Sequence, residues 1–348
     1  MARHIFQKTM IGLAVAGLVM SMIGCTQTDS NEKDSSSVSQ TQTEYDKETN
    51  SLSTWEQELG AEQLRTISSA AVRGMQVTKN GNVICAISYE PRTYKNSYDC
   101  WSFSVPYESW VSVDTEAMYE YFAHLETLNL EKTDVSEEEA GLTENTDNSI
   151  FVAYYSQQEE ENAGQAEPDE GITYWIGNEA DGEHYYVKTS CGNEIWTADK
   201  AAVDGLLEPE TYDMILKVAN LVSIETVSSV DIEIDGENYT IDLSDQENGN
   251  YKLNGTKADK EEVSSLYTEL ISIFIEKEIE DQNAERDTTE PIMTFTFHRN
   301  IEEAPDIVES FYKYEKDYAA VNINGTEFFL ADIASVNDLA DTIEEAFK

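Results

Sequence analysis

An internal repeat is the feature that most constrains how this chain can fold. Residues 113–132 (VDTEAMYEYFAHLETLNLEK) and residues 258–277 (ADKEEVSSLYTELISIFIEK) align without a gap. Both segments open on an aspartate, Asp114 and Asp259, where a helix N-cap is favoured, and both then carry apolar residues at helical spacing. Such a repeat predicts one structural unit built twice.

A second pair of matching segments lies further along each half of the chain. Residues 192–199 (GNEIWTAD) match residues 325–332 (GTEFFLAD), and strand-like runs at 185–189 and 319–323 precede them. Each pair predicts a β-hairpin that ends on an Asp able to begin a closing helix.

The order of these segments predicts an α+β fold, because helices alternate with antiparallel hairpins rather than with single parallel strands. We expect two tandem related modules, 55–207 and 223–348, each with antiparallel strands or hairpins, one long helix and a closing helix. Residues 208–222 are expected to form a helical connector between them.

The N-terminus has the form of an export signal. Arg3 and Lys8 are basic, and an apolar run covers 10–23. At about 1.5 Å per residue this run would make a helix of about 21 Å, too short for the ~30 Å core of a bilayer. A basic start followed by a short apolar run is typical of a signal peptide.

The end of that run resembles the lipobox of bacterial lipoproteins. Met22-Ile23-Gly24-Cys25 places a small residue before the cysteine, although Met22 replaces the usual Leu. The resemblance implies a signal peptide over 1–24 and a lipid such as palmitate on Cys25. It also implies an extracytoplasmic protein anchored to the cell membrane. Residues 25–54 are polar and predict a flexible tether.

The charge excludes several kinds of partner. The chain has 69 acidic and 22 basic residues, a formal net charge of −47. Nucleic acid is excluded, since phosphate binding needs clustered Lys and Arg. Unaided adsorption to an anionic membrane is excluded for the same reason. The acidic residues are interpreted as solubilising, with an acid-lined binding function as the alternative.

The cysteines other than Cys25 are Cys85, Cys100 and Cys191. Cys85 and Cys100 lie in two strand-like runs, so a disulfide between them is possible if those runs pair, and export would permit it. The spacing of Cys and His matches no zinc motif, and we expect neither a metal site nor a cofactor.

No catalytic motif stands out. The chain lacks a G-x-S-x-G elbow, a P-loop and a G-x-G-x-x-G turn. His124 falls on the first repeated helix and is expected to face solvent. The acidic runs 137–139 and 159–161 are interpreted as solvated loops, and 242–249 as a hairpin turn rather than a calcium loop.

Aromatic residues are the remaining candidates for a functional surface. Alternation along a strand puts half of each run on each face of a sheet, so one face would be core and the other could receive a partner. Core packing alone is the alternative explanation for these residues. The candidates for the partner surface are Tyr154, Tyr174, Trp175, Tyr186 and Trp196.

The order of several short motifs resembles that of family 4340 of the domains of unknown function. The resemblance covers most of the first module and is fainter in the second. It implies a secreted or membrane-anchored protein, and the occurrence of some members beside ABC-type transport components implies a transport-linked role. The matching motifs are Trp101-Ser102-Phe103, Ala140-Gly141-Leu142, Trp175-Ile176-Gly177 and Tyr185-Tyr186-Val187.

Taken together, these features predict a non-enzymatic lipoprotein with a binding or scaffold role at the cell envelope, accessory to an ABC-type transport system. Its expected partner is a membrane-proximal protein, because the lipid anchor concentrates the chain there. Two alternatives stay open at this point. One is a carboxylate-using hydrolase of envelope carbohydrate or peptide, and the other is a cation-binding or adhesive surface protein.

Overall fold

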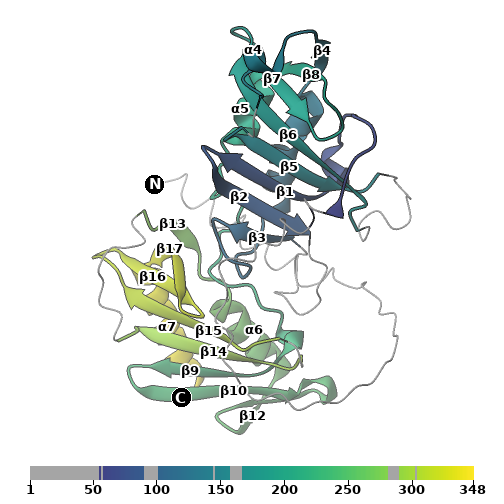
Figure 1. The fold of residues 1–348 in the computed structure, drawn as a ribbon. Coiled ribbons are helices and arrows are strands. Elements are labelled where there is room, and N and C mark those ends of the chain that lie inside the picture. Colours follow the sequence, from purple (N-terminus) through teal and green to yellow (C-terminus); the bar gives the residue numbers. More distant parts are fainter. Residues whose placement is uncertain are drawn as a thin grey trace, which may run out of the picture. The chain divides into compact units, whose positions relative to one another are not determined.

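A computed structural model of the chain describes residues 55, 58–89, 101–143, 146–156, 167–280, 290–301 and 304–348 (Figure 1). These residues belong to one compact unit, Lys47–Lys348. The expected signal peptide, Cys25 and the tether over 25–54 lie outside the described residues, so the anchor stays a prediction. Within the described residues, no helix is both long and apolar enough to cross a membrane.

The first sheet has eight strands, and each strand pairs antiparallel with its neighbours. Its order is β3-β2-β1-β5-β6-β7-β8-β4. The strands are β1 (Val72–Lys79), β2 (Asn82–Tyr89), β3 (Trp101–Val105), β4 (Glu131–Thr133), β5 (Ser149–Tyr154), β6 (Glu170–Glu179), β7 (His184–Thr189) and β8 (Ile195–Asp199). The helices of this half are η1 (Ser69–Ala71), α3 (Thr115–Phe122), η2 (Ala123–Thr127), α4 (Glu137–Ala140) and α5 (Lys200–Leu207).

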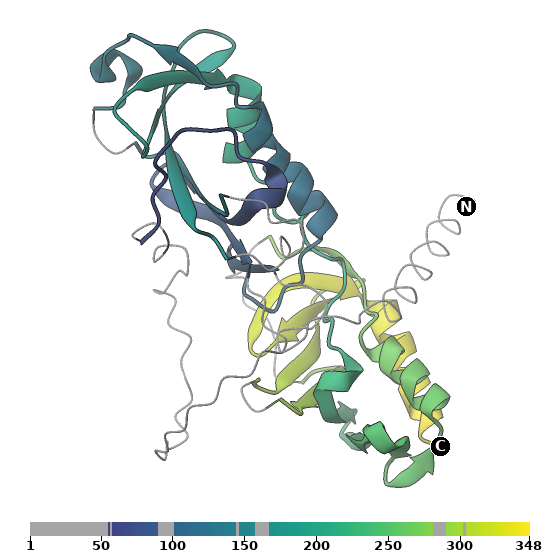
Figure 2. The same cartoon turned by 90° about the vertical axis from the view of Figure 1, so that its right-hand side faces the viewer.

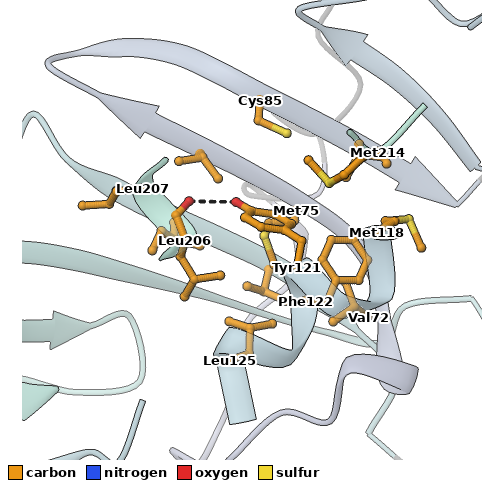
Figure 3. Packing of buried hydrophobic residues seen from close by; sticks show 14 of the residues in the cluster. Val72, Met75, Cys85, Met118, Tyr121, Phe122, Leu125, Leu206, Leu207 and Met214 are labelled. Carbon is orange, nitrogen blue, oxygen red and sulfur yellow. Dashed lines mark hydrogen bonds between the residues drawn. The ribbon is translucent and has the colours of Figure 1, made fainter. Parts of the chain in front are cut away.

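Helices α3 and α5 cover one face of this sheet. Met118 and Phe122 of α3 and Leu206 of α5 are fully buried against strand residues such as Met75 (Figure 3). The hydroxyl of Tyr121 donates to the carbonyl oxygen of Leu206 at 2.7 Å, which ties the two helices together inside the core. Each buried aromatic or aliphatic side chain of this kind stabilises the fold by roughly 1.5–3 kcal/mol.

The second sheet has nine strands in the order β12-β11-β10-β9-β14-β15-β16-β17-β13. The strands are β9 (Val227–Ile234), β10 (Glu237–Asp245), β11 (Asn250–Leu253), β12 (Thr256–Ala258), β13 (Ile275–Glu278), β14 (Met293–Arg299), β15 (Ile307–Lys313), β16 (Tyr318–Ile323) and β17 (Thr326–Asp332). The helices are η4 (Ile224–Thr226), η5 (Gln246–Asn248), α6 (Lys260–Leu270) and α7 (Ile333–Ala346). Helices α6 and α7 lie on one face of this sheet (Figure 2) and bury Leu266, Leu270 and Val336 against its strands.

The expected α+β class is confirmed as a mixed fold with two mostly antiparallel sheets. The strand orders of the two sheets also correspond. If β12 is left out, each strand of the second sheet occupies the position that the strand at the same place in the chain order occupies in the first sheet. The matching orders are β11-β10-β9-β14-β15-β16-β17-β13 and β3-β2-β1-β5-β6-β7-β8-β4. Both expected hairpins are present, as β7–β8 and β16–β17.

The two helices expected over 113–132 and 258–277 are shorter than the repeat suggested. Helix α3 ends at Phe122, η2 continues to Thr127, and Asn129 then takes a left-handed φ of 48°. Helix α6 ends at Leu270. The last residues of each repeat form the edge strands β4 and β13, which pair with β8 and β17. Buried side chains beyond each helix end continue the apolar spacing, so the pattern did not reveal where the helix stops.

The helical connector expected over 208–222 is wrong. This segment is built of turns and isolated bridges, Val113↔Ile215 and Val218↔Phe274. The amide of Leu216 donates to the carbonyl oxygen of Ser112 at 2.9 Å. Its backbone groups therefore bond in local turns and to neighbouring segments instead of in an i to i−4 ladder.

The core beneath the first sheet includes residues from the second. Ile275 of β13 and Phe329 of β17 belong to the same buried cluster as Met118 and Leu206. The ring of Phe329 lies 5.1 Å from that of Tyr107, measured between centroids. The two sheets therefore share part of one core.

Candidate functional site

The strands of the first sheet present two different faces. Along β6, Ile172, Tyr174 and Ile176 face α3 and α5 and are buried. The alternate residues, Trp175 among them, point the other way. On β7, Lys188 pairs with Trp175 across the strands, so it shares this second face. We call it the outer face of the first sheet.

The five aromatic residues expected to form one partner surface do not share a face. Tyr154 and Tyr174 are each only 2% exposed and belong to the core under the helices. Trp196 pairs with Val187, which also faces the core. Only Trp175 and Tyr186 reach the outer face, where they pack against one small apolar cluster. The five-residue surface is therefore wrong, because strand alternation divides it.

The corner around helix α4 is docked onto the outer face through Gly177. A Cβ atom at Gly177 would lie only 2.2 Å from the carbonyl oxygen of Ala140, so only glycine allows this approach. Helix α4 is capped by the side chain of Ser136, which accepts the amide of Glu139 at 3.2 Å. It ends at Gly141, whose φ of 70° is left-handed.

A pocket of about 340 Å³ opens between this corner, β6, β7 and the turn before β8. One wall is the indole of Trp175, which is partly exposed. The other lining groups are mostly hydroxyls, an amide and backbone. The lining residues are Leu142, Thr143, Trp175, Lys188, Thr189, Ser190, Gly192 and Asn193.

Lys188 is the one charged residue among those lining the pocket, and its ammonium forms an ion pair with the carboxylate of Glu137 on α4. The Lys188 side chain is 22% exposed and that of Glu137 is 41% exposed, so the pair lies at the pocket rim. Nearby, Lys132 and Glu194 form a second pair at 3.5 Å. The walls are therefore polar but nearly neutral in charge.

Two histidines each lie between aspartates. The Nδ1 and Nε2 atoms of His298 lie 2.8 Å and 2.9 Å from carboxylate oxygens of Asp306 and Asp231. His184 lies 2.9 Å from Asp181. Hydrogen bonds to these aspartates raise the pKa of both imidazoles above the ordinary value. The spacing of the histidines in the sequence gave no sign of either arrangement.

A buried carboxyl group in the second core has a strongly raised pKa. Glu309 of β15 is fully buried, and its Oε2 accepts a hydrogen bond from the side-chain amide of Asn220 at 3.3 Å. Its other oxygen, Oε1, has no hydrogen-bond partner. Loss of solvation raises the pKa of Glu309 to about 8, so the carboxyl is protonated at neutral pH.

The acidic turn over 242–249 is a hairpin, as expected. It joins β10 to β11, and Lys252 holds the carboxylate of Asp242 at 2.7 Å. The bonds from Lys252 and Ser244 lower the pKa of Asp242 to about 2. Across the described ranges, no group of three or more His, Cys, Asp or Glu side chains could hold a metal ion.

The possible disulfide between Cys85 and Cys100 stays a prediction. Cys85 is a free, buried thiol whose pKa burial raises to about 12, and Cys100 lies outside the described residues.

His124 is half-buried rather than fully solvent-facing. It lies in η2, and its ring packs over Gly205 of α5, where a Cβ atom would come within 2.6 Å of it. The aligned residue in the second repeat, Glu269, is exposed as expected for that position. His124 therefore serves the packing of the two helices.

No family model, curated protein or solved structure matches this chain. The resemblance to family 4340 stays a prediction. Two of its motifs nevertheless meet in space, because Leu142 and Gly177 lie against each other at the docked corner. Sequence reasoning named Trp175 but missed Lys188 and the turn 190–193, since the pocket exists only once the corner is docked.

Proposed function

We propose that this chain is a non-enzymatic lipoprotein, anchored outside the cytoplasmic membrane through Cys25, that binds a ligand or partner in the Trp175 pocket. The lipobox over 22–25 supports the anchor. The observation that carries the binding role is the pocket itself. A partly exposed indole and several polar groups converge there on the sheet face opposite helices α3 and α5.

We also infer that the chain is made of two tandem related modules, 55–207 and 223–348, joined by 208–222. The matching strand orders and the gapless repeat support this organisation. The first module would bind through its outer face and the second would support it. A membrane-proximal protein, such as a component of an ABC-type transporter, is the partner that the anchor favours.

Complementation in a deletion strain of the native host tests the binding role. Trp175→Ala removes the pocket wall, whereas Trp196→Ala is a matched control on the same sheet, partly exposed but on the opposite face. We expect Trp175→Ala to lose the function and Trp196→Ala to keep it, at equal protein levels. Equal complementation by both variants would contradict the proposed site.

The anchor needs its own test. Cys25→Ala should abolish labelling by a fatty-acid probe and release the chain from membranes. A Cys25→Ala variant that still carries the label would refute the assignment.

A further inference from the structure

We propose that the Trp175 pocket recognises a neutral saccharide, such as a terminal unit of an envelope glycan. This inference rests on the proposed binding function and gives it a ligand class. It depends on three properties of the pocket: the chemistry of its lining, the balance of its charges and the rigidity of its aromatic wall.

The lining combines one aromatic wall with a set of hydrogen-bonding groups. A pyranose ring has a face of C–H groups that packs well on an indole, and a rim of hydroxyls that need donors and acceptors. Trp175 offers the first surface, and Thr143, Ser190 and Asn193 offer side-chain groups of the second kind. A purely apolar ligand would leave these polar groups unpaired, which costs free energy.

The charges favour a neutral ligand over an ionic one. Lys188 is already paired with Glu137, so an anion would have to displace a carboxylate and would also meet the field of a chain with net charge −47. A cation would be attracted by that field, but inside the pocket it would meet the ammonium of Lys188, the one charged group of the lining. A hydroxyl group suffers neither conflict, because an ammonium paired with one carboxylate keeps further N–H donors and the carboxylate keeps acceptor sites.

The aromatic wall is held in place before any ligand binds. Trp175 packs against a cluster in which Ala140, Leu142 and Ile195 are buried. The docked corner behind it depends on Gly177, and Asn178 of β6 donates to the carbonyl oxygen of Glu139 at 3.1 Å. A wall fixed in this way loses little entropy on binding, which favours affinity for a small, weakly held ligand.

The size of the pocket sets the size of the occupant. A volume of about 340 Å³ lies at the low end of the ~300–1,000 Å³ that ligand pockets span. This limits the bound part to a small molecule or to the end of a longer glycan.

The test uses the full lipidated chain in a detergent without a sugar head group. An array of neutral and charged glycans first ranks the sugars that bind. Titration calorimetry with two neutral probes, maltose and N,N′-diacetylchitobiose, then measures the affinity. Glucuronic acid and glucosamine serve as the anionic and cationic probes. We expect saturable binding of a neutral glycan that weakens at least tenfold in Trp175→Ala and stays within twofold in Trp196→Ala.

A second pair of variants separates recognition from folding. Trp175→Phe keeps an aromatic wall and should keep most of the binding, while Lys188→Met should weaken it without changing the circular dichroism. Saturation-transfer NMR should place ring C–H protons of the sugar, rather than its substituents alone, against the protein in the wild type.

The outcomes distinguish this inference from the proposed function. If Trp175→Ala abolishes complementation but no neutral glycan binds, the ligand class is wrong and the site stands. The same holds if a charged probe binds in a Trp175-dependent manner and neutral glycans do not. If Trp175→Ala complements fully, the site itself is wrong, and any sugar binding observed in vitro would not support the inference.

Discussion

The outer faces of the two sheets make the most informative comparison in this molecule. Each carries a small apolar cluster beside its short edge strand, formed by Ala140, Leu142 and Ile195 on the first sheet and by Ile279, Ala320 and Leu330 on the second. On the second sheet, the ammonium of Lys277 lies 3.9 Å from the ring centroid of Tyr318 and covers that aromatic ring. On the first sheet, the ring of Trp175 lines an open pocket.

The open ring on the first sheet lies beside the segment that joins the edge strand β4 to β5. On the first sheet this segment folds into the α4 corner, which supplies a wall and the carboxylate of Glu137. On the second sheet, the hydroxyls of Thr294 and Ser310 lie 2.9 Å apart on neighbouring strands. The same strand order can thus carry different chemistry, because a site depends on the segments added to a fold.

The cores differ as well. The inward residues of β6 are Ile172, Tyr174 and Ile176, whereas the corresponding strand β15 places Glu309 among apolar side chains. The first core in turn takes Phe329 from the second sheet. The first core therefore depends on a residue of the second sheet, and the second core encloses a carboxyl group that the first lacks among its described residues.

The largest effect is expected for Phe329→Ala. This residue is fully buried in the first core although it lies on β17, and removing such a side chain costs about 3–5 kcal/mol. All five Trp residues precede residue 223, so tryptophan fluorescence reports mainly on the first half, although Trp110 also packs against the second core. We expect Phe329→Ala to lower the denaturation midpoint seen by fluorescence.

Phe297→Ala is the matched control, because Phe297 is equally buried but belongs to the second core alone. It should lower the midpoint seen by far-ultraviolet circular dichroism more than the one seen by fluorescence. If Phe329→Ala left the fluorescence midpoint unchanged, the shared core would be refuted.

Glu309→Gln should remove part of the pH dependence of stability. The pKa of Glu309 is about 8 in the fold and near 4.5 when unfolded, so the fold holds a proton that the unfolded chain releases. The resulting stabilisation is complete below pH 4.5 and is lost as the pH rises to about 8. At about 1.4 kcal/mol per pH unit, the wild type should lose roughly 3 kcal/mol relative to the Gln variant between pH 5.5 and 7.5.

Urea unfolding of both proteins at several pH values measures this difference. The exposed acids contribute equally to the pH dependence of the unfolding free energy of both proteins, so their contribution cancels in the comparison. Parallel curves for the wild type and the variant would show that Glu309 is ionised in the fold.

Gly177→Ala should disturb the docked corner. The added methyl group would meet the carbonyl oxygen of Ala140 at 2.2 Å, a clash that typically costs about 1–3 kcal/mol. Because the corner forms part of the pocket, any Trp175-dependent binding should fall sharply. Gly182→Ala is the control, since a Cβ atom there meets nothing within 4 Å. Thermal unfolding and a binding assay check both variants, and equal behaviour would contradict the close approach.

The smallest effect concerns the two aspartates that begin the repeated helices. Asp114 accepts hydrogen bonds from the amides of Glu116 and Ala117, whereas the side chain of Asp259 makes no capping bond to α6. We expect Asp114→Ala to cost about 1 kcal/mol and Asp259→Ala clearly less. Chemical denaturation would measure both, and equal losses would mean that the caps are equivalent in solution.

Sequence reasoning found the elements that local chemistry determines. The hairpins β7–β8 and β16–β17 follow from apolar runs bounded by turns, and Asp114 is an N-cap as predicted. The helix ends were missed because β4 and β13 form only where an edge of the sheet is available to pair with them. The pairing partner is a tertiary feature, and no local pattern encodes it.

The candidate site was predicted only in part. Trp175 and Tyr186 were named, but the sequence could not separate them from Tyr154 and Tyr174, because both faces of the sheet carry large aromatic side chains. The pocket requires Gly177 to meet Ala140 from a distant part of the chain. A glycine inside a strand otherwise rich in large side chains was the signal that could have indicated this close approach.

The edge strands have a consequence for how copies of this chain would behave when crowded. A lipid-held protein, as proposed here, is confined to a surface, where neighbours collide often and in similar orientations. Unpaired strands at a sheet margin would then invite one copy to add onto another. Strands β4 and β13 are only three and four residues long, and their exposed positions include Glu131, Lys132 and Glu278. Along β4 and β13, such short, charged margins disfavour the joining of adjacent copies into a continuous sheet.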